Sequence, residues 1–372
     1  MATTIRHPPH AGQPAAEETN MKLLIGRAEL TRVLTNVSRV VEARNTIPIL
    51  SSLRLSAADG KLTVTGTDLD IVATDTAAAD VTEGGSLCVD AKLFGDIVKK
   101  VGGDISISLE AEKLIVKSGR SRFSLATLPA TDFPDLGGGT FTAEFELDLA
   151  SLFAPVSFAI SNEETRHYLN GVFFSSADGQ PSVAVATDGH RLARNFGPVL
   201  PTFAGIIVPR KTVSLLPKGV ARVSVSENKI RVISGDFVMT SKLIDGTFPD
   251  YQRVIPMQNA NAVTVNRDDM LQAAERVVTV SSEKTRAVKL SVAPGSISLS
   301  ARSEIGDAED EVAAEYSGEP LSIGFNSAYL RDMLAVLPSG KVTLQIADAG
   351  SPARVLGEAG GWDGVLMPYR VH

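Results

Sequence analysis

Short stretches in which apolar and polar residues alternate recur along the whole chain. Three of them follow one another in 105-ISISLEAEKLIVKSGRSRFSLATL, and this period of two is typical of β-strands with one buried face. Between such strands lie runs such as 87-LCVDAKLFGDIVKKV, in which apolar residues recur at i, i+3 and i+4. That spacing predicts short amphipathic helices, so the pattern as a whole favours an α+β fold.

The same order of predicted elements occurs three times. The copies begin near residues 22, 144 and 262, and each reads as a strand, a helix of about ten residues, an arginine and two strands joined by a glycine turn. The marker arginines, Arg44, Arg166 and Arg286, are 122 and 120 residues apart. Each copy continues with a similar second half, starting near residues 87, 206 and 322. The repeat predicts three tandem domains at 21–139, 140–260 and 261–372, each a doubled βαβββ unit.

A strand-rich doubled unit buries its apolar surface when its two helices stack on one face of its sheets. Three such units in a row would place all six helices on a common side and the sheets outside, and self-association of such arcs can close a ring. The alternative is three domains on a flexible string. The junctions near residues 137–139 and 258–261 are short, which favours rigid packing.

Composition narrows the class of protein. The chain of 372 residues has a formal net charge of −7, which argues against a surface that grips nucleic acid everywhere but allows a basic face. No run of about 18 apolar residues predicts a membrane span. The single cysteine, Cys88, excludes an internal disulfide framework and a cysteine zinc site, and it fits a cytoplasmic location. We interpret residues 1–20 as a disordered extension or an early start site, with folding from Met21.

The segment 185-VATDGHRLAR raises the question of catalysis, because Asp188 and His190 are two residues apart. A catalytic triad also needs a nucleophile and an oxyanion site, and the chain has no G-x-S-x-G, H-E-x-x-H or phosphate-binding loop motif. The first copy has 67-TDLD at the same place, without a histidine. We therefore predict a turn in which the aspartate caps backbone N–H groups, and no enzyme. A hydrolase that uses Asp188 and His190 remains the alternative, as does a monomeric scaffold.

Eight motifs, in order from residue 44 to residue 371, carry a family resemblance. They are RNTIPILSSL, TDLDI, SGRSRFSLATLPATDFPDL, ETRHYLNGVFF, VATDGHRLA, IIVPRKTV, SKLIDGTFPDYQRVIP and VLMPYRV. Together they resemble the bacterial β sliding clamp family, the processivity factor of DNA polymerase III. The resemblance implies a head-to-tail homodimer around double-stranded DNA, without sequence-specific contacts and without a cofactor. It also implies partners that dock short Gln-x-x-Leu-Phe-like motifs: the DNA polymerase III catalytic subunit, the clamp loader, other polymerases and repair proteins.

The resemblance implies a partner-binding pocket with apolar walls and a basic rim. Its residues are Arg166, Leu169, Thr187, Gly189, His190, Arg191, Leu192, Pro249, Arg253, Val254, Asn326, Tyr329, Val365, Met367, Pro368, Tyr369 and Arg370. Without the resemblance, a place in the core is the alternative for Leu169 and Val254. The sequence departs from the family at Tyr369, where Met or Leu is common, and at Gly350 and Pro352.

A DNA-facing set is expected on the inner helices and nearby loops, because sliding needs sequence-independent phosphate contacts. It comprises Arg27, Arg32, Arg39, Arg44, Lys92, Lys99, Lys100, His167, Tyr168, Arg210 and Lys211, and a solvated helix face is the alternative for each. The segment 149-LASLFAPVSFAI has no charge and contains Pro155, so we expect a kinked or shortened helix that contributes less to DNA contact.

Opposite charges suggest a subunit interface formed by strand edges. The basic stretch 119-GRSRFSL contrasts with the acidic run in 304-EIGDAEDEV, for which a solvated loop is the alternative. The predicted interface residues are Arg120, Arg122, Phe123, Leu125, Val278, Val280, Glu304, Asp307, Glu309, Asp310 and Glu311. Val278 and Val280 would meet Phe123 and Leu125 in its apolar centre.

Overall fold

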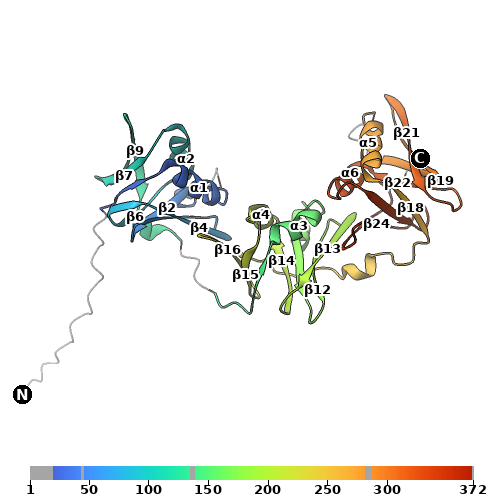
Figure 1. Ribbon diagram of the computed structural model, residues 1–372, viewed down its shortest axis with the longest axis horizontal. Helices are drawn as coiled ribbons and strands as arrows, with labels where there is room; N and C mark the ends of the chain where they lie inside the picture. The colour runs from blue at the N-terminus through green and yellow to red at the C-terminus, as the bar shows by residue number, and fades with distance from the viewer. Residues whose placement is uncertain (1–19, 43–45, 135–138, 281–286, 371–372) are drawn as a thin grey trace, which may run out of the picture. The chain divides into compact units, whose positions relative to one another are not determined.

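The computed structural model describes residues 20–42, 46–134, 139–280 and 287–370 (Figure 1). Two of the marker arginines, Arg44 and Arg286, lie outside these ranges, as do residues 1–19 of the predicted extension. The chain divides into two compact units, and each is described by itself. The first comprises residues 1–137 with 235–239, and the second comprises 138–234 with 240–372.

The first unit contains one doubled βαβββ domain, with one additional short strand. Its elements are β1 (Lys22–Ile25), α1 (Arg27–Ser38), β2 (Ser52–Ala58), β3 (Lys61–Thr67), β4 (Ile71–Ala78), β5 (Asp80–Glu83), β6 (Gly85–Asp90), α2 (Ala91–Lys100), β7 (Ile105–Glu110), β8 (Lys113–Ser118) and β9 (Ser121–Leu128). Its strands lie in the order β4-β3-β2-β6-β9-β8-β7-β1-β5. Helix α1 packs against α2 and against β3 and β4, so the two helices share one side of the domain.

The second unit contains the other two copies, except for residues 235–239, which include the first half of β17 and belong to the first unit. The second copy consists of β10 (Ala143–Leu147), α3 (Leu149–Ser157), β11 (Gly171–Ser176), β12 (Pro181–Thr187), β13 (Arg191–Val199), β14 (Phe203–Pro209), α4 (Arg210–Leu215), β15 (Ala221–Val225), β16 (Lys229–Ser234) and β17 (Phe237–Lys242). The third consists of β18 (Asn261–Asn266), α5 (Arg267–Val278), β19 (Ala287–Ala293), β20 (Ser296–Ser303), β21 (Gly306–Glu315), β22 (Leu321–Asn326), α6 (Ser327–Ala335), β23 (Lys341–Ile346), β24 (Ala353–Gly357) and β25 (Trp362–Leu366).

A continuous sheet joins the second and third copies. Its order is β14-β11-β12-β13-β25-β24-β23-β18-β21-β20-β19-β22, and the junction is the antiparallel pair β13–β25, in which Arg194 lies opposite Asp363. Helices α3 and α4 pack together, as do α5 and α6 (Figure 1). The predicted fold class, three tandem copies of a doubled βαβββ unit, is confirmed.

Polar caps at strand ends explain where several helices begin. Asp90, Asp148, Asn266 and Asn326 each end a strand or follow it directly, and their side chains accept hydrogen bonds from the first turn of α2, α3, α5 and α6. Helix α3 is nine residues long and contains Pro155, but it is as long as α6 and continues to Ser157, so the proline does not shorten it relative to α6. Its buried face of leucine, phenylalanine and valine anchors it to β12 and β13.

Candidate functional site

The turn between β12 and β13 is built by the side chains of Thr187 and Asp188. The Asp188 carboxylate accepts hydrogen bonds from the backbone N–H groups of His190 (2.9 Å) and Arg191 (3.0 Å), and the Thr187 hydroxyl donates to the Arg191 carbonyl (2.7 Å). The first copy makes the same turn at residues 67–71. There the Asp68 carboxylate accepts hydrogen bonds from the backbone N–H groups of Asp70 (3.0 Å) and Ile71 (2.7 Å). The predicted capping role of this aspartate is confirmed.

Gly189 lies within this turn, at the position that Leu69 occupies in the first copy with a φ of +78°. Its φ of +88° belongs to the left-handed region, and a Cβ atom there would lie 2.8 Å from the Arg166 guanidinium. Any side chain at this position would therefore strain the turn and displace Arg166.

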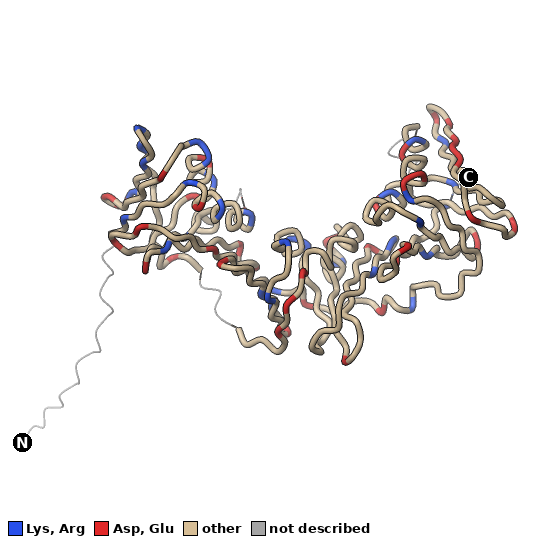
Figure 2. Tube along the Cα trace, viewed as in Figure 1, with Lys and Arg blue, Asp and Glu red and all other residues tan. Residues whose placement is uncertain are grey.

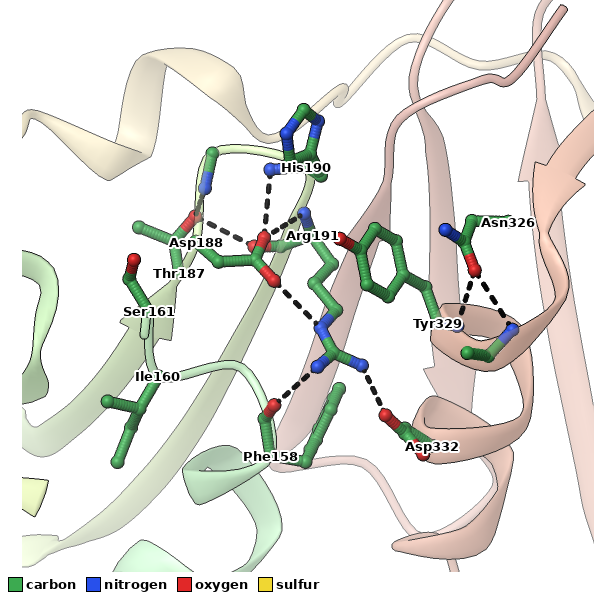
Figure 3. Close-up of polar contacts among 12 residues, drawn as sticks. Phe158, Ile160, Ser161, Thr187, Asp188, His190, Arg191, Asn326, Tyr329 and Asp332 are labelled. Carbon is green, nitrogen blue, oxygen red and sulfur yellow. Dashed lines mark hydrogen bonds and ion pairs between the residues drawn. The ribbon is translucent and has the colours of Figure 1, made fainter. Parts of the chain in front are cut away.

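Arg191 joins the turn of the second copy to helix α6 of the third (Figure 3). Its guanidinium donates to the carboxylates of Asp188 (3.1 Å) and Asp332 (2.6 Å) and to the Phe158 carbonyl (2.8 Å). It also lies over the Tyr329 ring, 4.4 Å from the centroid. The Arg191 side chain is only 11% exposed, so these contacts hold it in one position and connect the second copy to the third.

His190 points away from Asp188 and toward the third copy. Its ring stacks on that of Tyr329, with centroids 6.1 Å apart (Figure 3). The Asp188 carboxylate is occupied by backbone N–H groups and by Arg191, so it does not orient the imidazole as a triad requires. The hydrolase alternative has no support in this arrangement.

A cavity of about 380 Å³ lies beside these residues. Four predicted pocket residues line it, namely Arg166, His190, Arg191 and Tyr329. Arg166 forms an ion pair with Glu163, and this contact holds the pKa of the Glu163 carboxyl below its usual range. The rim of the cavity therefore carries both signs of charge and many hydrogen-bonding groups.

Arg210, which we predicted to face DNA, also lines this cavity. Its guanidinium donates to the carbonyls of Ile160 (3.0 Å) and Ser161, and burial lowers the pKa of the side chain. Arg210 thus fixes the 160–161 backbone as well as supplying positive charge.

Three other predicted pocket residues, Leu169, Leu192 and Val365, belong to one apolar cluster. They are 3–4% exposed and pack with Val185, Ile207, Phe248 and Ile255. Leu169 is therefore a core residue as well as a candidate wall. Val254 is 54% exposed, so the alternative that it is a core residue is wrong.

The C-terminal segment lies beside the same turn. The Met367 N–H donates to the His190 carbonyl (2.9 Å), and the Tyr369 N–H donates to the Gly324 carbonyl (2.7 Å). Met367 and Tyr369 are 42% and 44% exposed, which leaves their side chains available for contact. Pro249, Arg253 and Arg370 are also exposed, Pro368 is half-buried, and Asn326 caps α6.

Two family models for this fold match the second unit of the chain, and a third matches the first. The DNA polymerase III beta subunit N-terminal domain matches residues 21–137, the central domain matches 146–250, and the C-terminal domain matches 252–369. The chain belongs to the DNA polymerase III beta subunit family. The beta sliding clamp of Caulobacter vibrioides is 42% identical over 94% of this chain, and that of Escherichia coli K12 is 38% identical over 94%; both relatives are covered completely.

Solved structures of the family agree with the fold. The sliding clamp of Bartonella birtlesii, bound to griselimycin, has a TM-score of 0.91 and 39% identity, and covers 95% of this chain. The Caulobacter crescentus clamp, with polyethylene glycol in a putative beta-motif tethering region, has a TM-score of 0.91 and 41% identity, and also covers 95%. In both cases the whole of the solved chain is matched.

The residues predicted to face DNA in this family member differ in exposure and in the contacts that they make. Lys92, Lys99 and Lys100 are exposed on α2, and His167 is exposed before β11. Arg27 and Arg32 are engaged within their own domain: Arg27 donates to the Val98 and Lys99 carbonyls, and Arg32 binds the buried Asp75 carboxylate at 3.0 Å. Arg39 is exposed, Tyr168 and Lys211 are half-buried, and Arg44 lies outside the described residues.

The predicted interface residues of this family member lie on β9 and β21, in the turns just before these strands, and at or just after the end of α5. Arg120, Arg122, Glu304, Asp307, Glu309 and Glu311 are exposed, while Phe123, Val278, Val280 and Asp310 are half-buried. Leu125 is 4% exposed and packs inside its own domain, so its side chain is not free to form an interface.

Sequence reasoning missed the charged cluster at the junction of the second and third copies. Asp363 on β25 is bound by Arg194 (2.7 Å) and by Arg354 (2.8 Å), and its side chain is 4% exposed. A signal was present, because Asp363 is the single charge in the apolar strand WDGVL. Its arginine partner on β13, 169 residues away in sequence, could not be identified without the fold.

Within the described ranges, no cluster of His, Cys, Asp and Glu has the arrangement needed to hold a metal ion. Over the same ranges, no helix is long and apolar enough to cross a membrane.

Proposed function

We propose that this chain is a sliding clamp, a ring that encircles duplex DNA and tethers the replicative DNA polymerase and other replication and repair factors. The observation that carries the proposal is the match to relatives named beta sliding clamp along their entire length, through three tandem family domains. The clamp would confer processivity without catalysing a reaction, and it would act in the cytoplasm.

Two strand edges support closure of the ring as a head-to-tail homodimer. Strand β9 pairs with β8 from Ser121 to Ala126, but it meets β6 only through Thr127 and Leu128 in the part of the chain described. Likewise, β21 pairs with β20 from Gly306 to Ala313 and meets β18 only at residues 314–315. Each strand thus leaves backbone N–H and C=O groups open to another chain.

The charges on these two edges are complementary. Arg120 directly precedes β9 and Arg122 is its second residue, whereas β21 exposes Asp307, Glu309 and Glu311. In Figure 2 the β20–β21 hairpin is marked by acidic residues and the β8–β9 hairpin by basic ones. Opposite charges would fix the head-to-tail pairing and disfavour head-to-head pairing.

Substitution at the apolar positions of these edges tests the dimer. Phe123→Asp and Val280→Asp each place a charge in the proposed interface, and we expect each variant to sediment as a monomer at concentrations where the parent chain is a dimer. Val220→Asp, at a position 68% exposed in the second copy, is the matched control and should remain dimeric. A dimer that persists in both interface variants would contradict the assignment.

The cavity, the apolar cluster and the exposed C-terminal segment support a partner-binding pocket. Apolar anchors of a Gln-x-x-Leu-Phe-like segment would contact Leu169, Val254 and Met367, while Arg166, Arg253 and Arg370 would bind its backbone or acidic groups. The polymerase III catalytic subunit, the clamp loader and other polymerases or repair proteins would compete for this one site.

Calorimetry with a synthetic peptide of this motif tests the pocket. Met367→Ala removes a side chain that is 42% exposed, and we expect it to weaken peptide binding at least tenfold without changing the thermal midpoint. Leu169→Ala, or deletion of residues 367–372, should abolish binding while the dimer survives. Met257→Ala, 70% exposed, is the matched control. Unchanged affinity in all of the pocket variants would show that partners bind elsewhere.

A further inference from the structure

The hairpin turns of the second and third copies place His190 and Ile305 at equivalent positions. Strand register identifies the equivalence, because Thr187 lies opposite Leu192 in one hairpin and Arg302 lies opposite Asp307 in the other. The turn hydrogen bonds agree. The Asp188 side chain accepts from the His190 N–H at 2.9 Å, and the Ser303 hydroxyl accepts from the Ile305 N–H at 3.2 Å.

Helices α2 and α6 are equivalent in the same way. Asp90 caps α2 by accepting from the Leu93 N–H (2.7 Å), and Asn326 caps α6 with a contact to the Tyr329 N–H (3.5 Å). Leu93 is therefore the counterpart of Tyr329, because each is the third residue after its cap.

Within the chain, His190 and Tyr329 are in contact. The junction between the second and third copies pairs β13 with β25 and stacks the His190 ring on the Tyr329 ring (Figure 3). At the turn of β20–β21 and on α2, the equivalent residues are apolar and open to another chain. Ile305 is 82% exposed and Leu93 is 51% exposed.

We propose that Ile305 of one subunit packs on Leu93 of the other, in a subunit junction built on the plan of the β13–β25 junction. The proposal rests on the head-to-tail ring proposed above and names the contact that forms at each of its seams. An aliphatic pair takes the place of the stacked His190 and Tyr329 rings, and it accounts for two apolar side chains that the single chain leaves in water.

The register of the same plan accounts for the charges. Helices α1 and α5 begin at Arg27 and Arg267, so β1 and β18 are equivalent and Lys22 corresponds to Ala262. The strand pairings lead from Lys22 through Ser108 and from Ala262 through Gln345, which makes Ile107 the counterpart of Leu344 and Val116 that of Val355. Val116 lies opposite Phe123 and Val355 opposite Gly364, so Arg122 on β9 is the counterpart of Asp363 on β25. On the other strand, Glu309 is the counterpart of Arg194 by the hairpin register given above.

Within the chain, Arg194 on β13 lies opposite Asp363 on β25. If the subunit junction has the same register, Glu309 of one subunit lies opposite Arg122 of the other. Both signs are reversed, so the attraction is preserved.

Disulfide cross-linking tests the apolar contact directly. A chain carrying both Leu93→Cys and Ile305→Cys should form a covalent dimer on mild oxidation, seen by non-reducing electrophoresis, because the two new thiols would meet at each seam. The native Cys88 does not interfere, since it is buried and burial raises its pKa to about 12. Leu93→Cys alone, Ile305→Cys alone, and Ile305→Cys combined with Val220→Cys are the matched controls and should stay uncross-linked.

Sedimentation of the reduced double-cysteine variant separates the two proposals. A dimer that sediments as such but yields no more covalent product than the controls would overturn this contact and leave the ring intact. A parent chain that stays monomeric would overturn both.

Charge reversal tests the register independently. Arg122→Glu and Glu309→Arg should each weaken dimerisation at least tenfold, and the double variant should regain most of the loss. A double variant weaker than either single one would overturn the register.

Discussion

At the scale of single residues, the side chains that connect elements matter more than those that suggested chemistry. Asp188 and His190 invite a catalytic interpretation, but one caps a turn and the other stacks on Tyr329. The capping role could be predicted because the first copy has an aspartate at the same place without a histidine. The role of Arg191 could not, because its partner Asp332 is 141 residues away and meets it only in the fold.

Asp363 offers a prediction about stability at this scale. Asp363→Asn should leave Arg194 and Arg354, which are 15% and 16% exposed, without their shared carboxylate, at a cost of about 3 kcal/mol in the free energy of unfolding. Asp332→Asn is the control, because that carboxylate is 49% exposed and its loss should cost less than about 1 kcal/mol. Urea unfolding of both variants measures the difference, and equal losses would show that Asp363 is not a buried anchor.

At the scale of elements, the doubled βαβββ order could be predicted because period-two and helical spacing alternate so regularly. The extra strand β5 and the short helix α4, of six residues, could not. Residues 206–217 contain the expected apolar spacing, but Leu216 is extended and Pro217 follows it, so the helix ends early. The free edges of β9 and β21 likewise depend on strand order, which hydrophobic pattern alone does not determine.

Helix α2 carries the clearest candidates for contact with DNA. Lys92, Lys99 and Lys100 are exposed, whereas Arg27 and Arg32 are engaged in their own domain. Replacing the three lysines with Gln should weaken binding to a short duplex at low salt. It should also flatten the dependence of log K on log salt by about 0.9 for each lysine that contacts a phosphate. Lys113→Gln, on β8, is the control. An unchanged slope would remove α2 from the DNA-facing surface.

At the scale of the whole molecule, the same domain architecture occurs three times. Three copies share the strand order and turn chemistry, and the junction inside the second unit supplies a template for the seams of a ring. The net charge of −7 is compatible with this role, because a ring is held on DNA by topology and needs only weak, salt-sensitive phosphate contacts to slide. Sequence pattern alone predicted the three copies, but the family resemblance was needed for the dimer and its partners.

The most direct test of the proposed function is retention on DNA. The protein would be loaded by its cognate clamp loader and ATP onto a nicked circular plasmid, the plasmid cut once, and the bound protein counted at high salt before and after cutting. A ring held by topology slides off the new ends, so we expect retention on the circle and loss from the linear form. Equal retention on both forms would mean that the protein holds DNA by contact alone, which contradicts the clamp.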